Sequence, residues 1–268
     1  MNNIIDVKAM ADGILDKVAH LPNKKKLAII TVGNDKASQA YVRGKKRDCE
    51  RVGIEYYHSQ LDASTDSHVV KNLIDVFNHD DTVGGIILQL PTPYEAWEER
   101  TLLDAIYRNK DVDGFLQDSC FKPCTPEGIL YVLYSKYTRG LDGLNVLLIG
   151  RGALVGTPLI PLLLAENVTL TVAHSYTPKR RLDELLRANY DVVITATNRA
   201  MHINLAECNA RMVIDAGIGY WNGILAGNCY GGDYFFGKYT PVPGGVGLMT
   251  RAILMAHIAR ASDPTFKY

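Results

Sequence analysis

The sequence predicts an α/β fold made of two α/β domains, and three observations lead to this prediction. Short apolar runs typical of buried strands alternate with segments of helical spacing along the whole chain. This alternation occurs in two series, which meet near residue 114. In the second series a glycine-rich turn follows the first strand, as in a Rossmann-type dinucleotide-binding domain. We therefore expect two parallel sheets covered by helices, with the dinucleotide-binding domain second.

The first series contains three candidate strands, each followed by a candidate helix. The expected strands are residues 27–32, 54–57 and 84–90. Ser38 can cap the first helix, and Gly53 can end it. A second helix is expected over residues 69–78, where apolar residues have helical spacing, and a third over residues 97–107.

The second series begins with a helix and continues with four candidate strands. Pro126 is acceptable in the first turn of a helix that extends to about Lys136. The expected strands are residues 145–149, 168–173, 191–196 and 212–216. A helix follows the glycine-rich turn and extends through Leu164, and the last helix is expected over about residues 249–260.

The bulk composition limits the classes of function. The 268 residues include 29 Lys+Arg and 29 Asp+Glu, and this balance argues against a nucleic-acid scaffold or a polybasic membrane binder. No apolar run is long enough to span a bilayer, and the N-terminal residues lack the apolar core of a signal peptide. Five cysteines without zinc-ligand spacing predict reduced thiols in a cytoplasmic protein, with no metal site.

Tyr41 and Lys45 form the first candidate site. Residues four apart share one face of a helix, so an aromatic ring lies beside a cation. The ring can stack on a flat substrate, and the lysine can move a proton or hold a negative oxygen. The short-chain dehydrogenases also use a Tyr-x-x-x-Lys pair, but there it follows the cofactor glycines, whereas here it precedes them. That reading therefore fails.

The glycine-rich turn is the second candidate site. Gly150, Gly152 and Gly156 lie where a strand gives way to a helix, although the spacing is one residue longer than in the usual fingerprint. Arg151 can reach an adenosine phosphate. At the end of the next strand the chain has Ser175 in place of the acid that holds the ribose of NAD. Together these residues favour NADP.

The neighbouring basic residues Lys179, Arg180 and Arg181 allow two readings. They can assist in binding a 2′-phosphate, or they can form the solvated start of a helix.

Several segments together resemble the bifunctional methylenetetrahydrofolate dehydrogenase/methenyltetrahydrofolate cyclohydrolases. They occur in the family's order and cover nearly the whole chain. The segments are residues 32–45, 85–91, 110–115, 123–128, 150–151 with 155–158, 174–175, and 240–247 with 249–250. The resemblance implies an interdomain cleft, tetrahydrofolate derivatives bound by the first domain, NADP bound by the second, and a homodimer formed through the cofactor domains.

The last helix would return to the first domain in such a fold. We therefore expect a folate-binding domain of residues 1–113 plus 249–268, and an NADP-binding domain of residues 114–248.

The resemblance also implies a role for each matching residue. Tyr41 would lie against the aminobenzoyl ring of folate, and Lys45 would be the acid/base of the cyclohydrolase step. Gln89 would hold that lysine, and Asp113 would bind the pterin. The remaining candidates are Pro243, Gly244 and Gly245 near the folate and nicotinamide, and Gly150, Arg151, Gly152, Val155, Gly156 and Ser175 on the cofactor.

The chain departs from the family pattern mainly in its cofactor half. Gly152 replaces a serine, and Asn198 replaces a glycine near the cofactor, where it either crowds the nicotinamide or adopts the same left-handed backbone. Asn228 stands in the family's Gly-Asp-Val, and Leu248 replaces a proline. These departures keep open a relative that retains only the cyclohydrolase step or only ligand binding. A two-domain NADP oxidoreductase of shikimate-dehydrogenase type is the other alternative.

Overall fold

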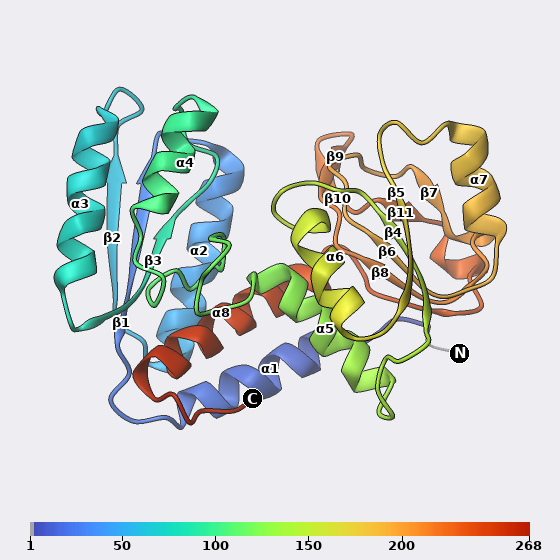
Figure 1. Cartoon of the computed structure of the whole chain (residues 1–268), viewed down its shortest axis with the longest axis horizontal. Helices are drawn as coiled ribbons and strands as arrows, with labels where there is room; N and C mark the ends of the chain where they lie inside the picture. The colour runs from blue at the N-terminus through green and yellow to red at the C-terminus, as the bar shows by residue number, and fades with distance from the viewer. Residues whose placement is uncertain (1–2) are drawn as a thin grey trace. The chain divides into compact units, whose positions relative to one another are not determined.

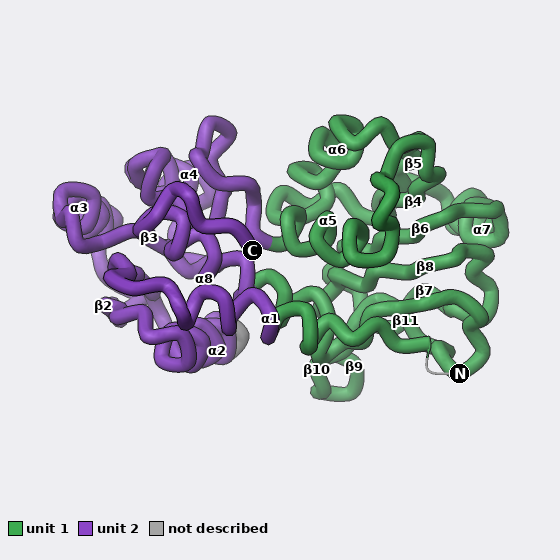
Figure 2. Tube along the Cα trace, turned by 90° about the horizontal axis from the view of Figure 1, so that it is seen from below, with its two compact units in different colours: residues 1–11, 125–250 green, residues 12–124, 251–268 purple. Residues whose placement is uncertain are grey.

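The computed structural model describes residues 3–268, with Lys36 and Ala37 described by their backbone only. The chain forms two compact units, coloured separately in Figure 2. One contains residues 12–124 and 251–268, and is called the lysine unit here because it contains Lys45. The other contains residues 3–11 and 125–250, and is called the glycine unit because it contains the turn at 150–156.

The boundaries of the two units differ from the expected ones at each crossing of the chain. Ile4 pairs with Tyr239 as a parallel bridge, which attaches the first residues to the glycine unit. Residues 114–124 belong to the lysine unit instead, because the Asp111 carboxylate accepts hydrogen bonds from the backbone N–H groups of Gly114 and Leu116. We keep the predicted ranges 1–113 plus 249–268 and 114–248 as a proposal for the functional division.

The lysine unit is built on a parallel three-stranded sheet of order β2-β1-β3 (Figure 1). Its elements are β1 (Lys26–Val32), α2 (Lys36–Val52), β2 (Tyr56–Leu61), α3 (Ser67–His79), β3 (Val83–Leu88) and α4 (Ala96–Asp104). Ala28, Ile30 and Ile86 point from the strands into a core that α3 and α4 complete. On α8 (Val246–Ser262), Ile258 approaches Gly85 so closely that a Cβ on Gly85 would lie 2.5 Å from the Ile258 side chain.

The glycine unit contains a parallel five-stranded sheet of order β12-β8-β6-β4-β5. Its helices are α5 (Cys124–Lys136), α6 (Gly156–Ala165) and α7 (Lys179–Arg187), and its 3-10 turns are η1 (Leu205–Glu207) and η2 (Gly232–Tyr234). The strands of the sheet are β4 (Asn145–Ile149), β5 (Thr169–Ala173), β6 (Tyr190–Thr195), β8 (Ala210–Asp215) and β12 (Lys238–Tyr239). The chain order reverses next to β4, which places the glycine-rich turn where doubly wound sheets bind ligands.

The predicted α/β class and its alternation are confirmed, but several local details differ. The second strand begins at Tyr56, because Ile54 still donates its N–H to Cys49 O and so closes the end of α2. Asp35 caps α2 by accepting from Ser38 N, so Ser38 is not the cap. The sequence did not predict α1 (Val7–Ala19), or the short strands β7 (Ile203–Asn204), β9 (Gly219–Trp221), β10 (Ile224–Ala226) and β11 (Cys229–Tyr230).

The last helix, α8, extends over Val246–Ser262 and therefore starts three residues before the expected one. The boundaries between the units fall within α1, after the first residue of α5, and within α8. Within residues 3–268, no helix has the length and apolar character needed to cross a membrane. All five cysteines are free thiols. The described residues contain no cluster of three His, Cys, Asp or Glu side chains able to hold a metal ion.

Candidate functional site

Lys45 lies at the centre of a polar cluster in the lysine unit. Its Nζ donates to Gln89 Oε1 at 3.2 Å and forms an ion pair with Asp113 Oδ2 at 3.4 Å. The Lys45 side chain is 7% exposed and the Asp113 side chain 13%. Charges held this far from bulk water interact strongly, and their geometry is restricted. The cluster therefore presents an ammonium group held between an amide oxygen and a carboxylate.

Three elements bring these side chains together. Lys45 lies on α2, and Gln89 directly follows β3, where its N–H extends the pairing with β1 by donating to Ile30 O. Leu90 O accepts from both Ser38 Oγ and Gln89 Nε2, each at 3.0 Å. The start of α2 is thereby tied to the residue after Gln89, which orients the amide toward Lys45.

Hydrogen bonds from buried residues fix the backbone around Asp113. Val112 O accepts from His257 Nδ1 at 2.7 Å and from Cys124 Sγ at 3.2 Å. The backbone N–H of Cys124 donates to Asp113 O. Gly114 has a φ of +73°, and a Cβ there would lie 2.4 Å from Lys122 O. The Asp-Gly pair is therefore the close turn that aims the Asp113 carboxylate at Lys45.

Tyr41 lies one turn before Lys45 and is half-buried. Burial raises the pKa of Tyr41, and the nearby positive charge of Arg251 opposes that shift. Arg251, on α8, forms an ion pair with Asp48 at 2.9 Å. Its guanidinium occupies the space beside Gly44, where a Cβ would lie 2.0 Å from Nη1. Sequence reasoning missed this pair, because nothing in the spacing of Asp48 and Arg251 connects them.

The glycine-rich turn of the glycine unit has the close approaches that its glycines predict. A Cβ on Gly150, whose φ is +113°, would lie 2.3 Å from Ala196 O, and one on Gly156 would lie 2.2 Å from Gly150 O. No atom lies within 4 Å of the Cβ position of Gly152, so the outer side of the turn is open. Val155 directly precedes α6. The turn can therefore receive a pyrophosphate at the start of this helix.

Arg151 and the end of β5 lie together. The guanidinium of Arg151 is 6.0 Å from the centre of the Tyr176 ring, and Ser175, the neighbour of that tyrosine, is exposed. The basic residues that follow form exposed ion pairs on α7 with Asp183 and Glu184. This pairing favours the reading of Lys179, Arg180 and Arg181 as a solvated helix start.

A buried polar network supports the loops beside this turn. Asn228 is fully buried; its Oδ1 accepts from Thr197 N, and its Nδ2 donates to Thr197 O and Arg199 O at 3.0 and 2.9 Å. Asp215 Oδ2 accepts from Cys229 N. Asn228 therefore fixes the loop that follows β6 through three hydrogen bonds, two of which need an amide N–H.

The structure also describes Asn198 and Leu248, two other positions at which the chain departs from the family pattern. Asn198 is exposed and does not have a positive φ, so the left-handed alternative for it is wrong. Leu248 donates its N–H to Gly245 O, which a proline cannot do. Pro243, Gly244 and Gly245 belong to the glycine unit, in which Gly245 approaches Pro241 O.

Both units match family models. Residues 5–113 match the tetrahydrofolate dehydrogenase/cyclohydrolase catalytic domain, and residues 123–265 match the NAD(P)-binding domain of the same family. The chain belongs to the tetrahydrofolate dehydrogenase/cyclohydrolase family. Among its relatives, the bifunctional protein FolD of Agathobacter rectalis is 38% identical over 97% of this chain and 99% of its own length. That of Halalkalibacterium halodurans is 36% identical over 97% of this chain and 98% of its own length.

Solved structures agree with this family assignment. The FolD methylenetetrahydrofolate dehydrogenase/cyclohydrolase of Campylobacter jejuni has a TM-score of 0.86 and 30% identity, over 97% of this chain and 98% of that one. The Trypanosoma brucei enzyme, solved with NADP cofactor and an inhibitor, has a TM-score of 0.87 and 25% identity, over 99% and 98%. A chorismate mutase/shikimate 5-dehydrogenase fusion protein from Clostridium acetobutylicum shares the fold alone, at 13% identity and a TM-score of 0.55. The shikimate-type alternative is therefore not favoured.

Proposed function

We propose that the chain oxidises 5,10-methylenetetrahydrofolate to 5,10-methenyltetrahydrofolate with NADP⁺, and hydrolyses the product to 10-formyltetrahydrofolate. The observation that carries this proposal is the buried cluster in which Lys45 lies between Gln89 and Asp113. Family membership supplies the substrate class. The alternative of a relative that retains only one step or only ligand binding is not favoured, because relatives that match over nearly the whole chain are bifunctional.

Lys45 is the acid/base of the hydrolysis in this proposal. Water adds to the cationic methenyl carbon and loses one proton, which leaves a neutral hydroxyl adduct. As the hydroxyl then loses its own proton and its oxygen becomes the formyl carbonyl, the bond from that carbon to N5 breaks and N5 takes up a proton, so that one proton is released overall. One amine that accepts and then returns a proton suits this sequence. Gln89 and Asp113 fix the position of the amine, Asp113 also offers a carboxylate to the pterin N–H groups, and Tyr41 offers its ring for stacking.

The glycine unit holds the cofactor in this proposal. The close approaches of Gly150 and Gly156 and the open side of Gly152 fit a pyrophosphate, and Arg151 with Ser175 suits a 2′-phosphate. Bound NADP⁺ would accept the hydride from the methylene carbon. The protein's contribution to that step is alignment of two reactants, to which Val155, Pro243, Gly244 and Gly245 contribute shape.

Two absorbance assays run separately test the proposal: reduction of NADP⁺ with methylenetetrahydrofolate, and loss of the methenyl chromophore. Lys45→Met should lower the cyclohydrolase rate by at least about 100-fold, since acid/base catalysis contributes that much. Folate binding, measured by calorimetry, should remain detectable. Lys17→Met, at an exposed helical lysine, is the control and should leave both rates unchanged. Retained hydrolysis in Lys45→Met would remove Lys45 from its role.

The partner and the compartment are further parts of the proposal. We propose a homodimer formed through the glycine unit, supported by the exposed apolar side chains of its β9–β10 hairpin. Tyr220, Trp221 and Ile224 are 61%, 54% and 71% exposed. Ile224→Lys should shift the sedimenting species toward the monomer.

Five free cysteines support a reducing, cytoplasmic setting, and zero net charge supports the absence of nucleic-acid or membrane partners.

A further inference from the structure

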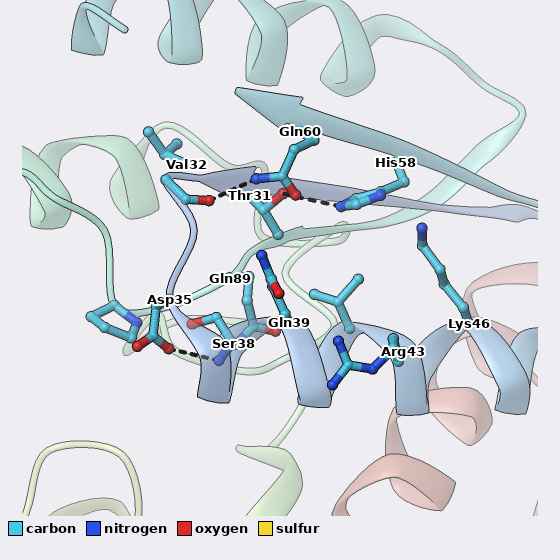
Figure 3. A pocket seen from close by; sticks show the side chains of 13 residues that line it. Thr31, Val32, Asp35, Ser38, Gln39, Arg43, Lys46, His58, Gln60 and Gln89 are labelled. Atoms are coloured by element: carbon cyan, nitrogen blue, oxygen red, sulfur yellow. Dashed lines mark hydrogen bonds between the residues drawn. The ribbon is translucent and has the colours of Figure 1, made fainter. Parts of the chain in front are cut away.

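A small cavity of about 130 Å³ lies between α2 and the carboxyl ends of β1 and β2 (Figure 3). Gln39, Arg43 and Lys46 line it from the helix, and Thr31, His58 and Gln60 line it from the strands. Tyr41 and Lys45 are not among its lining residues, so it uses a different face of α2 from the site described above. It far exceeds the roughly 10–15 Å³ that one water requires.

Among the described residues, three donors on the helix side have no hydrogen-bond or ion-pair partner. The side chains of Gln39, Arg43 and Lys46 form no hydrogen bond or ion pair with any described residue. Figure 3 shows Gln39 and Lys46 rising from α2 toward the strands that carry Gln60 and His58. The ammonium of Lys46 has one weaker contact, 5.6 Å from the centre of the Tyr56 ring. Donors gathered without acceptors around a cavity point to a ligand that supplies acceptors.

The strand side of the cavity is ordered by its own hydrogen bonds. The Thr31 hydroxyl donates to Gln60 Oε1 at 2.8 Å and accepts from His58 Nε2 at 3.0 Å. Gln60 Nε2 donates to Gly33 O at 2.6 Å. Since a hydroxyl has a single hydrogen, this arrangement places the proton of a neutral His58 on Nε2. The Nδ1 atom of the ring then stays available, and it becomes a donor when the ring is protonated.

The charge and size of the cavity select the ligand. Arg43 and Lys46 are opposed by one lining acid, Asp35, which caps α2 by accepting from Ser38 N. The volume is below the 300–1,000 Å³ typical of sites for whole cofactors, so the cavity admits a single small group. A guanidinium and an ammonium in the lining of one cavity suit an oxygen-rich anion. We propose that this cavity binds a small oxyanion, a phosphate or a carboxylate, with Arg43 and Lys46 as its cationic residues.

The oxyanion has two possible sources. It is either a free anion in solution or the glutamate carboxylate of the folate substrate, and only the second source rests on the proposed function. Gln89 lines the cavity and also accepts from Lys45, so either source lies next to the cluster that holds the acid/base.

Isothermal titration of the full chain with inorganic phosphate, and separately with L-glutamate, tests the free-anion source. Arg43→Gln and Lys46→Gln should each weaken binding at least about tenfold, as expected when a hydrogen bond to a charged group is lost. Arg139→Gln and Lys17→Gln, at exposed positions outside the cavity, are matched controls and should leave binding unchanged.

Tetrahydrofolate and tetrahydropteroate, which lacks the glutamate, test the substrate source. If the variants weaken tetrahydrofolate binding and leave tetrahydropteroate binding unchanged, the carboxylate is the ligand. The proposal would be overturned if, for each of phosphate, glutamate and tetrahydrofolate, Arg43→Gln and Lys46→Gln had the same affinity as the parent chain. Phosphate titration needs no turnover, so an inactive enzyme that still binds phosphate would contradict only the proposed function.

Discussion

Asn228→Asp restores the residue found in the family's Gly-Asp-Val, and we nevertheless expect it to destabilise this chain. The Asn228 amide donates to Thr197 O and Arg199 O in a fully buried position. A carboxylate has no N–H, so both carbonyls lose their donor. Each buried group left unpaired costs about 1–3 kcal/mol, which predicts a loss of about 2–6 kcal/mol in the free energy of unfolding.

The loss should also depend on pH. Burial would raise the pKa of the introduced carboxyl, and its protonated form regains one O–H donor. The destabilisation should therefore be smaller at about pH 5 than at about pH 8. Asn78→Asp is a matched buried control that loses only one donated bond, to Ala105 O, and should cost about half as much. Asn222→Asp, in the exposed hairpin turn, should cost nothing measurable.

The two tryptophans allow the unfolding of each unit to be followed separately. Trp97 lies in the lysine unit and Trp221 in the glycine unit, and there is no third. In a Trp97→Phe background, urea unfolding followed by fluorescence reports the unit that contains Asn228, and in a Trp221→Phe background it reports the unit that contains the control position Asn78. A loss below about 1 kcal/mol, equal to that of Asn222→Asp, would refute the reasoning, because an unpaired buried carbonyl costs more than that.

Three further predictions concern other parts of the molecule. Arg251→Met leaves the buried Asp48 carboxylate without its partner, so urea unfolding should show a loss of about 3 kcal/mol that adding Asp48→Leu largely recovers. Burial lowers the pKa of His58 below its ordinary value of 6.5, so the unfolded chain binds more protons as pH falls through 6.5. Stability should therefore drop there, and His58→Asn should reduce that drop in pH-dependent unfolding. Gly150→Ala places a Cβ 2.3 Å from Ala196 O at a φ of +113°, so calorimetry should show at least about tenfold weaker NADP⁺ binding.

The sequence predicted the alternation of strands and helices because buried parallel strands are continuous apolar runs. Leu147, Leu148 and Ile149 in β4 are typical of such a run. The bounds of β2 were wrong, with 54–57 expected and Tyr56–Leu61 observed, because this edge strand carries His58, Ser59 and Gln60 and lacks an apolar pattern. Short strands such as β9 and β10 contain too few residues to show a periodic pattern of apolar side chains.

The sequence predicted those residues of the candidate site that belong to a recognisable motif. Lys45, Gln89 and Asp113 came from matching segments, and the structure brings their side chains together. The residues that support them were missed, because a lone histidine such as His257 in an apolar helix gives no sign of its distant partner. Its contact with Val112 O joins positions far apart in the chain, which no local pattern can report.

The attachment of α8 to the lysine unit has a consequence for synthesis. Chains fold as they emerge from the ribosome, with N-terminal parts first. Residues 12–124 carry Lys45, Gln89 and Asp113, but His257 and Arg251 are translated only after the whole of residues 125–250. Until then Val112 O lacks its histidine donor and Asp48 its counter-ion. Folding of the first half of the chain is therefore completed only after the second half has been synthesised. The acid/base cluster reaches its final geometry only when α8 has been made.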